Sequence, residues 1–255
     1  MPPFGSERRY VEPRRLNRCL LAVCGWRQIG PWIRYWHVAR AIRELQPARI
    51  LEAGCGWGQN LFALQRQFPD AVLIGVDRDA AMVEVGRRIA ARLPGRQPQF
   101  VLGDLHAVSL EGVFELIVMV DVLEYVADDA LVLRRCRELL ADNGRFILHV
   151  PRRITEQRRV LPVSHDIPGH ARPEYTRQEI VDKVQEAGCE LEEVRATFGL
   201  WGTLAWECGR VCERFKPFGA LCFPFLLLLA RLDYWGKPHD GNGYLLVARR
   251  RITHA

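Results

Sequence analysis

The stretch Arg49-Ile-Leu-Glu-Ala-Gly-Cys-Gly-Trp-Gly58 decides the fold of this chain. It begins as a short apolar run that ends near an acidic residue, Glu52, and it then places Gly54, Gly56 and Gly58 at alternate positions. Glycines let backbone N–H groups come close to a ligand, and the helix predicted after Gly58 points its positive end at any carboxylate or phosphate there. The stretch therefore predicts a buried parallel strand that leads into a turn for a nucleotide-like cofactor.

The glycine spacing narrows the choice of cofactor. A dinucleotide fingerprint has the order G-x-G-x-x-G, whereas the third glycine here arrives one position early, which disfavours NAD and FAD. A second apolar run, residues 71–77, ends at Asp77, 19 positions after Gly58. A carboxylate at about 20 positions beyond such a turn can accept hydrogen bonds from both hydroxyl groups of a ribose.

Several segments in the same order resemble the motifs of one enzyme family. The order Glu-x-Gly-Cys-Gly-x-Gly resembles motif I of the class I S-adenosylmethionine-dependent methyltransferases, and the runs 98–104, 114–124 and 139–151 resemble the motifs that follow it. In the last run Asn143-Gly144 stands where these enzymes have a left-handed turn, which Asn-Gly suits. The resemblance covers roughly residues 40–200 and a final strand. It is closest to small-molecule enzymes with a D-V-L-E-H-V signature, in which Tyr125 here replaces the His.

The resemblance implies S-adenosyl-L-methionine as the methyl donor. It implies that the acid at Asp104 meets the adenine amino group and that the segment after the fourth strand passes beside the sulfonium. Asp121 taken singly is better explained as a solvated loop residue or a helix cap. The expected donor-binding residues are Glu52, Gly54, Cys55, Gly56, Gly58, Asp77, Arg78, Asp104, Leu105 and Asp121, and no metal ligands are expected.

Apolar strands alternate with helical patterns after residue 48. The helical patterns cover 59–68, 80–93 and 128–141, and the runs 190–199 and 243–250 predict a closing antiparallel pair. This alternation predicts an α/β fold: a doubly wound, Rossmann-like, seven-stranded sheet with an antiparallel last strand. The carboxyl ends of its parallel strands would bring Glu52, Asp77 and Asp104 to one crevice. We expect a methyltransferase domain over 47–199 and 240–251, a helical extension over 1–46 and a helical insertion over 200–239.

Positive charge is concentrated at the N-terminus. Residues 1–49 hold ten Arg and three Glu, a balance of +7 against +6 for the whole chain. Aromatic and aliphatic residues alternate with these arginines in 19–26 and 31–42, which suits either a helix on an anionic bilayer or a helix that covers the cofactor pocket. The segment has no signal-peptide pattern, and the eight cysteines lack C-x-x-C spacing, so we expect a cytoplasmic protein, peripheral on the inner face of the membrane if the segment binds lipid.

The insertion contains the most apolar part of the chain. The run 218–230 has thirteen residues, includes Pro224 and is too short for a transmembrane helix, which needs about 20. A helix packed on the sheet and a lid over an apolar acceptor, dipping into a membrane, are the two interpretations, and the second is favoured. Cys208 and Cys212 lie one helical turn apart, and packing explains them better than a metal site.

Histidines near the fifth strand are candidates for acid–base chemistry. His165 and His170 lie in a loop before a predicted capping box at Thr176 and Glu179, and one of them is expected to face the acceptor. For His170 a structural role is equally well supported, and His149, inside a strand, is predicted to be a hydrogen-bonded core residue. The predicted acceptor is small and hydrophobic: a lipid, a quinone or an aromatic compound.

Two other functions remain open at this stage, and methylation of DNA is excluded. DNA is excluded because Asp121-Val-Leu-Glu124 stands where such enzymes have Asn or Asp followed by Pro-Pro-Tyr or Phe. Methylation of RNA through the basic N-terminal segment ranks second. A non-catalytic, membrane-associated protein on the same fold ranks third, because the glycine turn and Asp77 are intact.

Overall fold

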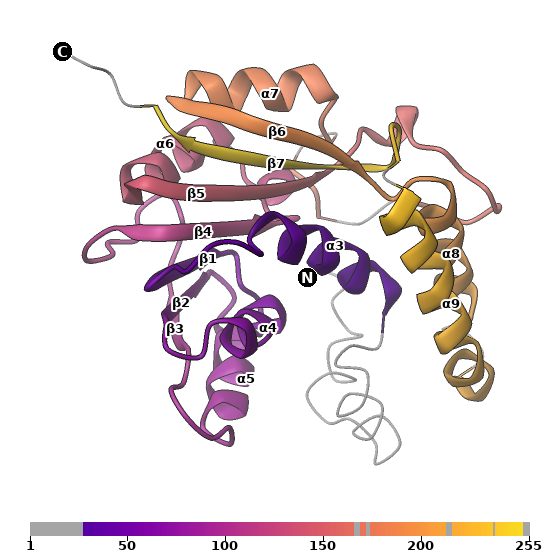
Figure 1. The fold of residues 1–255 in the computed structure, drawn as a ribbon, viewed down its shortest axis with the longest axis horizontal. Coiled ribbons are helices and arrows are strands. Elements are labelled where there is room, and N and C mark those ends of the chain that lie inside the picture. The colour runs from indigo at the N-terminus through magenta and orange to yellow at the C-terminus, as the bar shows by residue number, and fades with distance from the viewer. Residues whose placement is uncertain (1–27, 166–168, 172–173, 213–215, 237, 252–255) are drawn as a thin grey trace.

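The computed structural model describes residues 28–165, 169–171, 174–212, 216–236 and 238–251. Within them seven strands form one sheet in the order β3-β2-β1-β4-β5-β7-β6 (Figure 1). β1 to β5 are parallel, and β7 is antiparallel to both β5 and β6. This order confirms the predicted doubly wound sheet with an antiparallel last strand. The strands are β1 Arg49–Ala53, β2 Val72–Asp77, β3 Gln99–Leu102, β4 Phe114–Val120, β5 Leu140–Pro151, β6 Cys189–Thr197 and β7 Gly243–Arg250.

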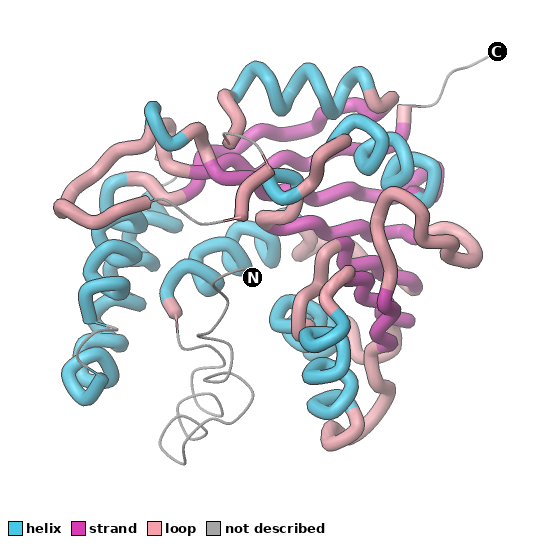
Figure 2. The backbone as a smooth tube through the Cα atoms, turned by 180° about the vertical axis from the view of Figure 1, so that it is seen from behind, coloured by secondary structure: helices cyan, strands magenta, loops and turns pink. Residues whose placement is uncertain are grey.

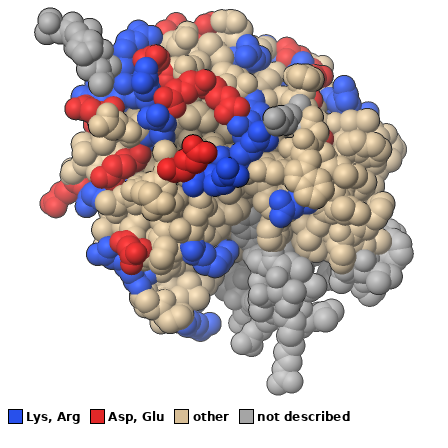
Figure 3. Space-filling view, viewed as in Figure 1, with Lys and Arg blue, Asp and Glu red and all other residues tan. Residues whose placement is uncertain are grey.

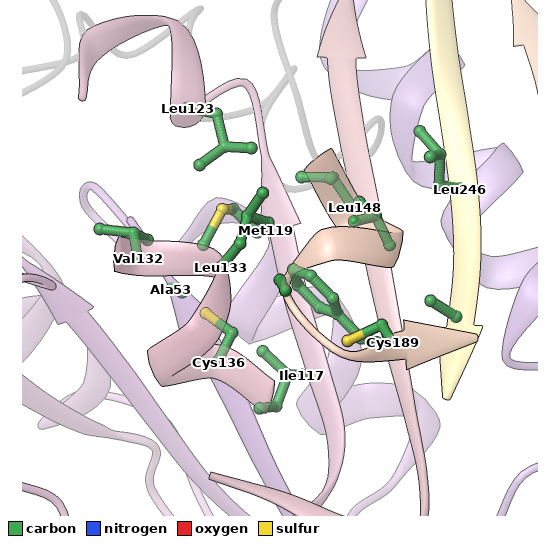
Figure 4. Close-up of a cluster of buried hydrophobic side chains, with 14 of the residues drawn as sticks. Ala53, Ile117, Met119, Leu123, Val132, Leu133, Cys136, Leu148, Cys189 and Leu246 are labelled. Atoms are coloured by element: carbon green, nitrogen blue, oxygen red, sulfur yellow. The ribbon is translucent and has the colours of Figure 1, made fainter. Parts of the chain in front are cut away.

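Helices cover both faces of the sheet (Figures 1 and 2). β4 at the centre is buried on both sides: Ile117 and Met119 belong to the core under α6 and α7, and Leu116 and Val118 to the core under α3, α4 and α5. This alternation follows the two-residue period of a strand, and Figure 4 shows part of the first core. The helices are α3 Ile29–Ala41, α4 Gln59–Gln67, α5 Ala80–Ala90, α6 Asp129–Leu139, α7 Arg177–Glu186, α8 Leu200–Cys212 and α9 Lys216–Gly236, with short 3₁₀ turns η1 Leu123–Tyr125 and η2 Ile154–Glu156.

The described part of 200–239 consists mainly of two helices, α8 and α9, which pack with α3. Ile33 of α3, Ala205 of α8 and Leu226 of α9 belong to a third cluster of buried residues, separate from the two cores of the sheet. In both Figure 1 and Figure 2, α3 lies between the pair α8–α9 and the helices α4 and α5. The amphipathic pattern over 31–42 corresponds to α3, whereas the pattern over 19–26 lies outside the described residues.

The expected left-handed turn at Asn143-Gly144 is wrong. Neither residue has a positive φ angle, and both lie within β5, which begins directly after α6. Leu140 pairs with Phe114 and Arg145 pairs with Leu116, so the residues between 140 and 145 form a bulge instead of a separate turn. A Cβ atom at Gly144 would come within 2.9 Å of the Phe114 carbonyl oxygen. Glycine is therefore needed there for close backbone approach.

Candidate functional site

The three glycines after β1 have left-handed backbone conformations, with φ angles of 77° at Gly54, 52° at Gly56 and 86° at Gly58. A Cβ atom at Gly54 would lie 2.3 Å from a Val122 methyl group, and one at Gly58 would lie 2.4 Å from the Phe100 ring. At Gly56 a Cβ atom would meet nothing within 4 Å. The turn is thus packed against protein on two sides and open at Gly56, where a ligand can reach the backbone.

Asp77 holds the open part of this turn. Its Oδ2 accepts a hydrogen bond of 2.6 Å from the Gly56 N–H, and its Oδ1 accepts one of 2.9 Å from the Asp79 N–H. The side chain lies at the carboxyl end of β2 and is half-buried. Each carboxylate oxygen can accept a second hydrogen bond, so a diol at this position would find two acceptors already oriented.

Glu52 is buried beneath the turn. Asn60, in the first turn of α4, donates to its Oε1 at 2.9 Å, and Oε2 is buried with no partner among the described residues. Burial raises the pKa of Glu52 to about 8, although the hydrogen bond from Asn60 works in the opposite direction. The carboxyl group is therefore largely protonated at neutral pH, and a cation placed nearby would favour its ionisation.

Asp104 lies after β3 with its side chain exposed. Hydrogen bonds from the backbone and ring of His106 lower the pKa of Asp104, and the His106 Nδ1 lies 2.6 Å from its carboxylate. Leu105 is half-buried against the core under α6, whereas Arg78 is exposed. Arg78 is close enough to contribute a small electrostatic effect on the pKa of Asp104. These residues line the edge of the sheet beside Asp77.

Both carboxylate oxygens of Asp121, at the end of β4, contact protein partners. Its carboxylate forms an ion pair of 2.5 Å with the Arg34 guanidinium of α3 and lies 2.6 Å from the His149 Nδ1. Burial opposes ionisation of Asp121, but Arg34 and then His149 outweigh it, so the pKa lies below its ordinary value. The His149 Nε2 continues the chain of contacts to the Thr197 hydroxyl at 2.9 Å, as expected for a core histidine. Asp121 therefore fixes α3 over the strand ends.

His170 occupies a second polar cluster next to Asp121. Its Nδ1 lies 3.0 Å from a Glu174 carboxylate oxygen, its ring contacts the Tyr125 ring edge-on at 4.7 Å, and its Nε2 is buried without a partner among the described residues. Glu124 is also buried there, and burial, followed by the charge of Asp121, raises its pKa. With the proton on Nδ1, His170 donates to Glu174 and leaves Nε2 as an acceptor, which is the arrangement of an oriented base.

The comparisons with known proteins agree with this geometry. A family model described as a methyltransferase domain matches residues 51–146, which run from β1 through the glycine turn into β5. The chain carries a class I methyltransferase domain.

Curated relatives of the methyltransferase domain include two named enzymes. Trans-aconitate 2-methyltransferase of Methylobacterium radiotolerans is 34% identical over 43% of this chain and 40% of its own length. Ubiquinone biosynthesis O-methyltransferase of Azorhizobium caulinodans is 32% identical over 45% of this chain and 44% of its own length. The chain thus matches less than half of each relative's length, and the two names give acceptors of different chemistry.

A solved structure extends the similarity in fold over most of the chain. N-methyltransferase NodS of Bradyrhizobium japonicum WM9, in complex with S-adenosyl-L-homocysteine, covers 86% of each chain with a TM-score of 0.57 and 16% identity. At that identity the likeness is one of fold.

The structure separates the two candidate histidines of the methyltransferase domain. Both ring nitrogens of His165 are engaged, with Nδ1 2.7 Å from the Gln157 amide oxygen and Nε2 2.7 Å from a Glu207 carboxylate oxygen. Glu207 also accepts hydrogen bonds from the Val160 and Leu161 N–H groups. His165 is therefore a buried residue that links its loop to α8 through Glu207. The geometry favours His170 over His165 as the residue that faces an acceptor.

Sequence reasoning missed the partners that orient these groups. Arg34, Glu174 and Glu207 come from α3, a loop and α8, and nothing in their local sequence indicated which acid or histidine each would meet. The contact between Asn60 and Glu52 is the exception that sequence reasoning could have found, because Asn60 is the second residue of α4 and directly follows the glycine turn. A cavity of about 640 Å³, lined by Phe62, Gln65 and Arg96 among others, adjoins the C-terminal half of α4 and does not belong to this site.

Proposed function

We propose that this chain transfers the methyl group of S-adenosyl-L-methionine to a small hydrophobic acceptor, of lipid, quinone or aromatic type. The observation that carries the donor half of the proposal is the open space at Gly56 beside the oriented Asp77 carboxylate. The family match over residues 51–146 and the NodS complex with S-adenosyl-L-homocysteine support it.

The residues at the strand ends fit such a donor. The Gly56 backbone leaves room for it, Asp77 offers acceptors to a ribose, and the unpaired Oε2 of Glu52 can respond to a positive charge. Asp104 and Leu105 would flank its adenine, and Gly54, Cys55 and Gly58 would shape the turn beneath it. When bound, the donor supplies a methyl group on an already activated leaving group, so positioning of the acceptor provides much of the acceleration.

His170 is proposed as the base for a hydroxyl acceptor. Its Nε2, which has no hydrogen-bond partner among the described residues, is buried beside Tyr125, and Glu174 fixes the ring from the other side. A phenol or alcohol must lose its proton as the methyl group arrives, and a buried imidazole nitrogen can take that proton. His165, held at both nitrogens, is proposed to position the loop.

The acceptor class rests on the surroundings of the site. Phe198 lies under the Arg34 guanidinium at 5.2 Å, and Tyr125 lies against His170, so aromatic surfaces adjoin both polar clusters. The relative named for ubiquinone biosynthesis is consistent with a phenolic acceptor, whereas the trans-aconitate relative would favour a carboxylate.

Six described cysteines are free thiols, which supports a reducing, cytoplasmic location.

A transfer assay tests the two halves of the proposal separately. Donor binding is measured by calorimetric titration with S-adenosylhomocysteine, and failure of the wild-type chain to bind would remove the donor half and leave a non-catalytic scaffold. The chain is then incubated with methyl-labelled donor and with cell extract divided into organic-soluble, small water-soluble and RNA fractions. We expect protein-dependent label in the organic fraction. Label in either other fraction would keep the donor site and reject the hydrophobic acceptor.

The matched variant for this assay is Asp77→Asn. It keeps the size of the side chain, but it removes the negative charge and leaves one acceptor oxygen in place of the two that receive the Gly56 and Asp79 N–H groups. We expect it to lose both S-adenosylhomocysteine binding and label transfer, whereas Asp70→Asn, at the opposite ends of the strands, should behave like the wild type.

A further inference from the structure

A row of apolar side chains on α9 is exposed. Phe225, Leu228, Leu232 and Trp235 are 62%, 52%, 42% and 62% exposed, and their spacing of three, four and three residues places them on one face of the helix. The opposite face is used for packing against α3 and α8 and contains Phe223, Leu226, Leu229, Ala230 and Asp233. α9 therefore presents apolar side chains in two directions, and the described part of the chain covers only one of them.

The first turn of α8 has two further exposed apolar side chains close to the end of α9. The Asp233 carboxylate of α9 accepts a 3.0 Å hydrogen bond from the Gly199 N–H, and backbone bonds from the following residues join it. The start of α8 is thus held beside the last turns of α9. Leu200 and Trp201 are each 45% exposed at this point. We name the surface formed by Phe225, Leu228, Leu232, Trp235, Leu200 and Trp201 the α8–α9 apolar face.

Among the described residues of α3, α8 and α9, the exposed charges have one sign. The acids of α3, α8 and α9 are Glu207 and Asp233, and both are buried. Arg40, Arg210 and Arg231 are at least partly exposed, and each guanidinium lies over an aromatic ring at 4.3 to 5.7 Å. Figure 3 shows a broad area over α8 and α9 with little red or blue, in contrast to the mixed charges over β6 and β7. The exposed charge on the described residues of these three helices is therefore positive, and the exposed Asp240 of the adjoining loop is paired with Arg152 and Arg158.

We propose that the α8–α9 apolar face docks the protein on an anionic lipid bilayer. Tryptophan, phenylalanine and leucine on one side of a helix, with arginines beside them, suit the boundary between acyl chains and negatively charged headgroups. No described helix is long and apolar enough to span a membrane, so contact would be from one side. A symmetric pair of chains joined here would bring the same arginines of both copies together, which disfavours a second copy as the occupant.

Vesicle flotation tests the docking surface. The full chain is mixed with phosphatidylcholine vesicles and with vesicles that also contain phosphatidylglycerol, and floated on a density gradient at low and high salt. We expect the wild type to float with the anionic vesicles and to do so less at high salt. The variant Leu228→Gln with Trp235→Gln should bind at least about tenfold more weakly, because it removes two large side chains from the contact.

Two matched variants separate apolar from charged contributions. Val113→Gln changes an equally exposed residue (47%) before β4 and should float like the wild type. Arg231→Gln should weaken binding to anionic vesicles by about fivefold and leave binding to phosphatidylcholine alone unchanged. Urea unfolding of each variant shows whether it is folded.

Three outcomes would overturn the proposal. The first is recovery of the wild type only in the unfloated fraction. The second is flotation of the double variant, which keeps every basic residue of 1–27, as strongly as the wild type, because another segment would then bind the lipid. The third is a wild-type dimer, detected by light scattering without vesicles, that the double variant converts to a monomer, because the face would then be an interface between copies.

Discussion

Gly56→Ala should mainly weaken ligand binding and Gly58→Ala should mainly lower stability, although both glycines have positive φ angles. The φ of 52° at Gly56 lies in the left-handed region that alanine enters at a cost of about 1–2 kcal/mol, and the loss of unfolded-state freedom returns about 0.4–1 kcal/mol. A Cβ atom there meets nothing within 4 Å, so no packing cost is added. We expect Gly56→Ala to lower the free energy of unfolding by about 1 kcal/mol, and by no more than about 1.6 kcal/mol.

Gly58→Ala carries a further cost. Its Cβ atom would lie 2.4 Å from the Phe100 Cζ, and overpacking of this kind costs about 1–3 kcal/mol in addition to the left-handed backbone. We expect a loss of about 2–4 kcal/mol. For ligand binding the order is reversed, because the methyl group of Gly56→Ala would occupy the open space that we assign to the donor. Its affinity for S-adenosylhomocysteine should fall at least about tenfold.

Urea unfolding and calorimetric titration of the two variants measure these effects. The reasoning about the open turn would be refuted if Gly56→Ala bound S-adenosylhomocysteine like the wild type, or if it were as unstable as Gly58→Ala. Gly95→Ala is a suitable control, because Gly95 also has a positive φ (82°) and open space around its Cβ position, but lies far from the site. It should show a similar small loss of stability with unchanged binding.

Three further predictions concern titratable groups. Burial raises the pKa of Glu52 to about 8, so the chain without ligand should lose stability as the pH rises from about 4.5 to 8. Binding of the cationic donor should strengthen over the upper part of that range. Calorimetric titration from pH 6 to 8 should show this increase in donor affinity in the wild type and not in Glu52→Gln. His170→Ala should lower kcat by a factor of about 10² to 10⁴ without changing the affinity for S-adenosylhomocysteine, and Glu174→Gln should lower kcat less, with KM unchanged. The control His239→Ala, at an exposed position, should keep the wild-type rate. Normal turnover of His170→Ala would show that His170 is not the base. Burial lowers the pKa of His37 to about 3, so below about pH 6.5 the unfolded chain binds a proton that the folded chain does not bind. The free energy of unfolding should therefore fall by about 2 kcal/mol between pH 6.5 and 5. Urea unfolding of His37→Leu should show a smaller fall over this range, and an equal fall would contradict the role given to His37.

The sequence predicted the strand ends and the glycine turn well because these depend on local chemistry. The alternation of apolar runs and helical patterns required a parallel sheet, and parallel strands bring their carboxyl ends to one edge whatever their loops contain. Glu52, Asp77 and Asp104 could therefore be placed without coordinates. Asn143-Gly144 shows the limit of local reasoning, because pairing of β5 with β4 overrode the preference of Asn-Gly for a left-handed turn.

What each candidate histidine does could not be read from its own neighbourhood in the chain. His165 and His170 lie five positions apart in one loop, yet His165 meets Glu207, 42 residues away on α8, and His170 keeps its Nε2 without a described partner. Asp121 likewise loses both its oxygens to Arg34 and His149, which only the docking of α3 on the sheet brings close.

The sequence by itself determined where the backbone must be bare and where acids must end the strands. It also showed that the segment before the last strand is apolar. The tertiary structure alone decided which polar atoms are already satisfied and which remain open, and which side of α9 faces water. The physical reason is that satisfaction and burial are properties of contacts between distant segments, whereas turns, strands and helical faces are largely written in neighbouring residues.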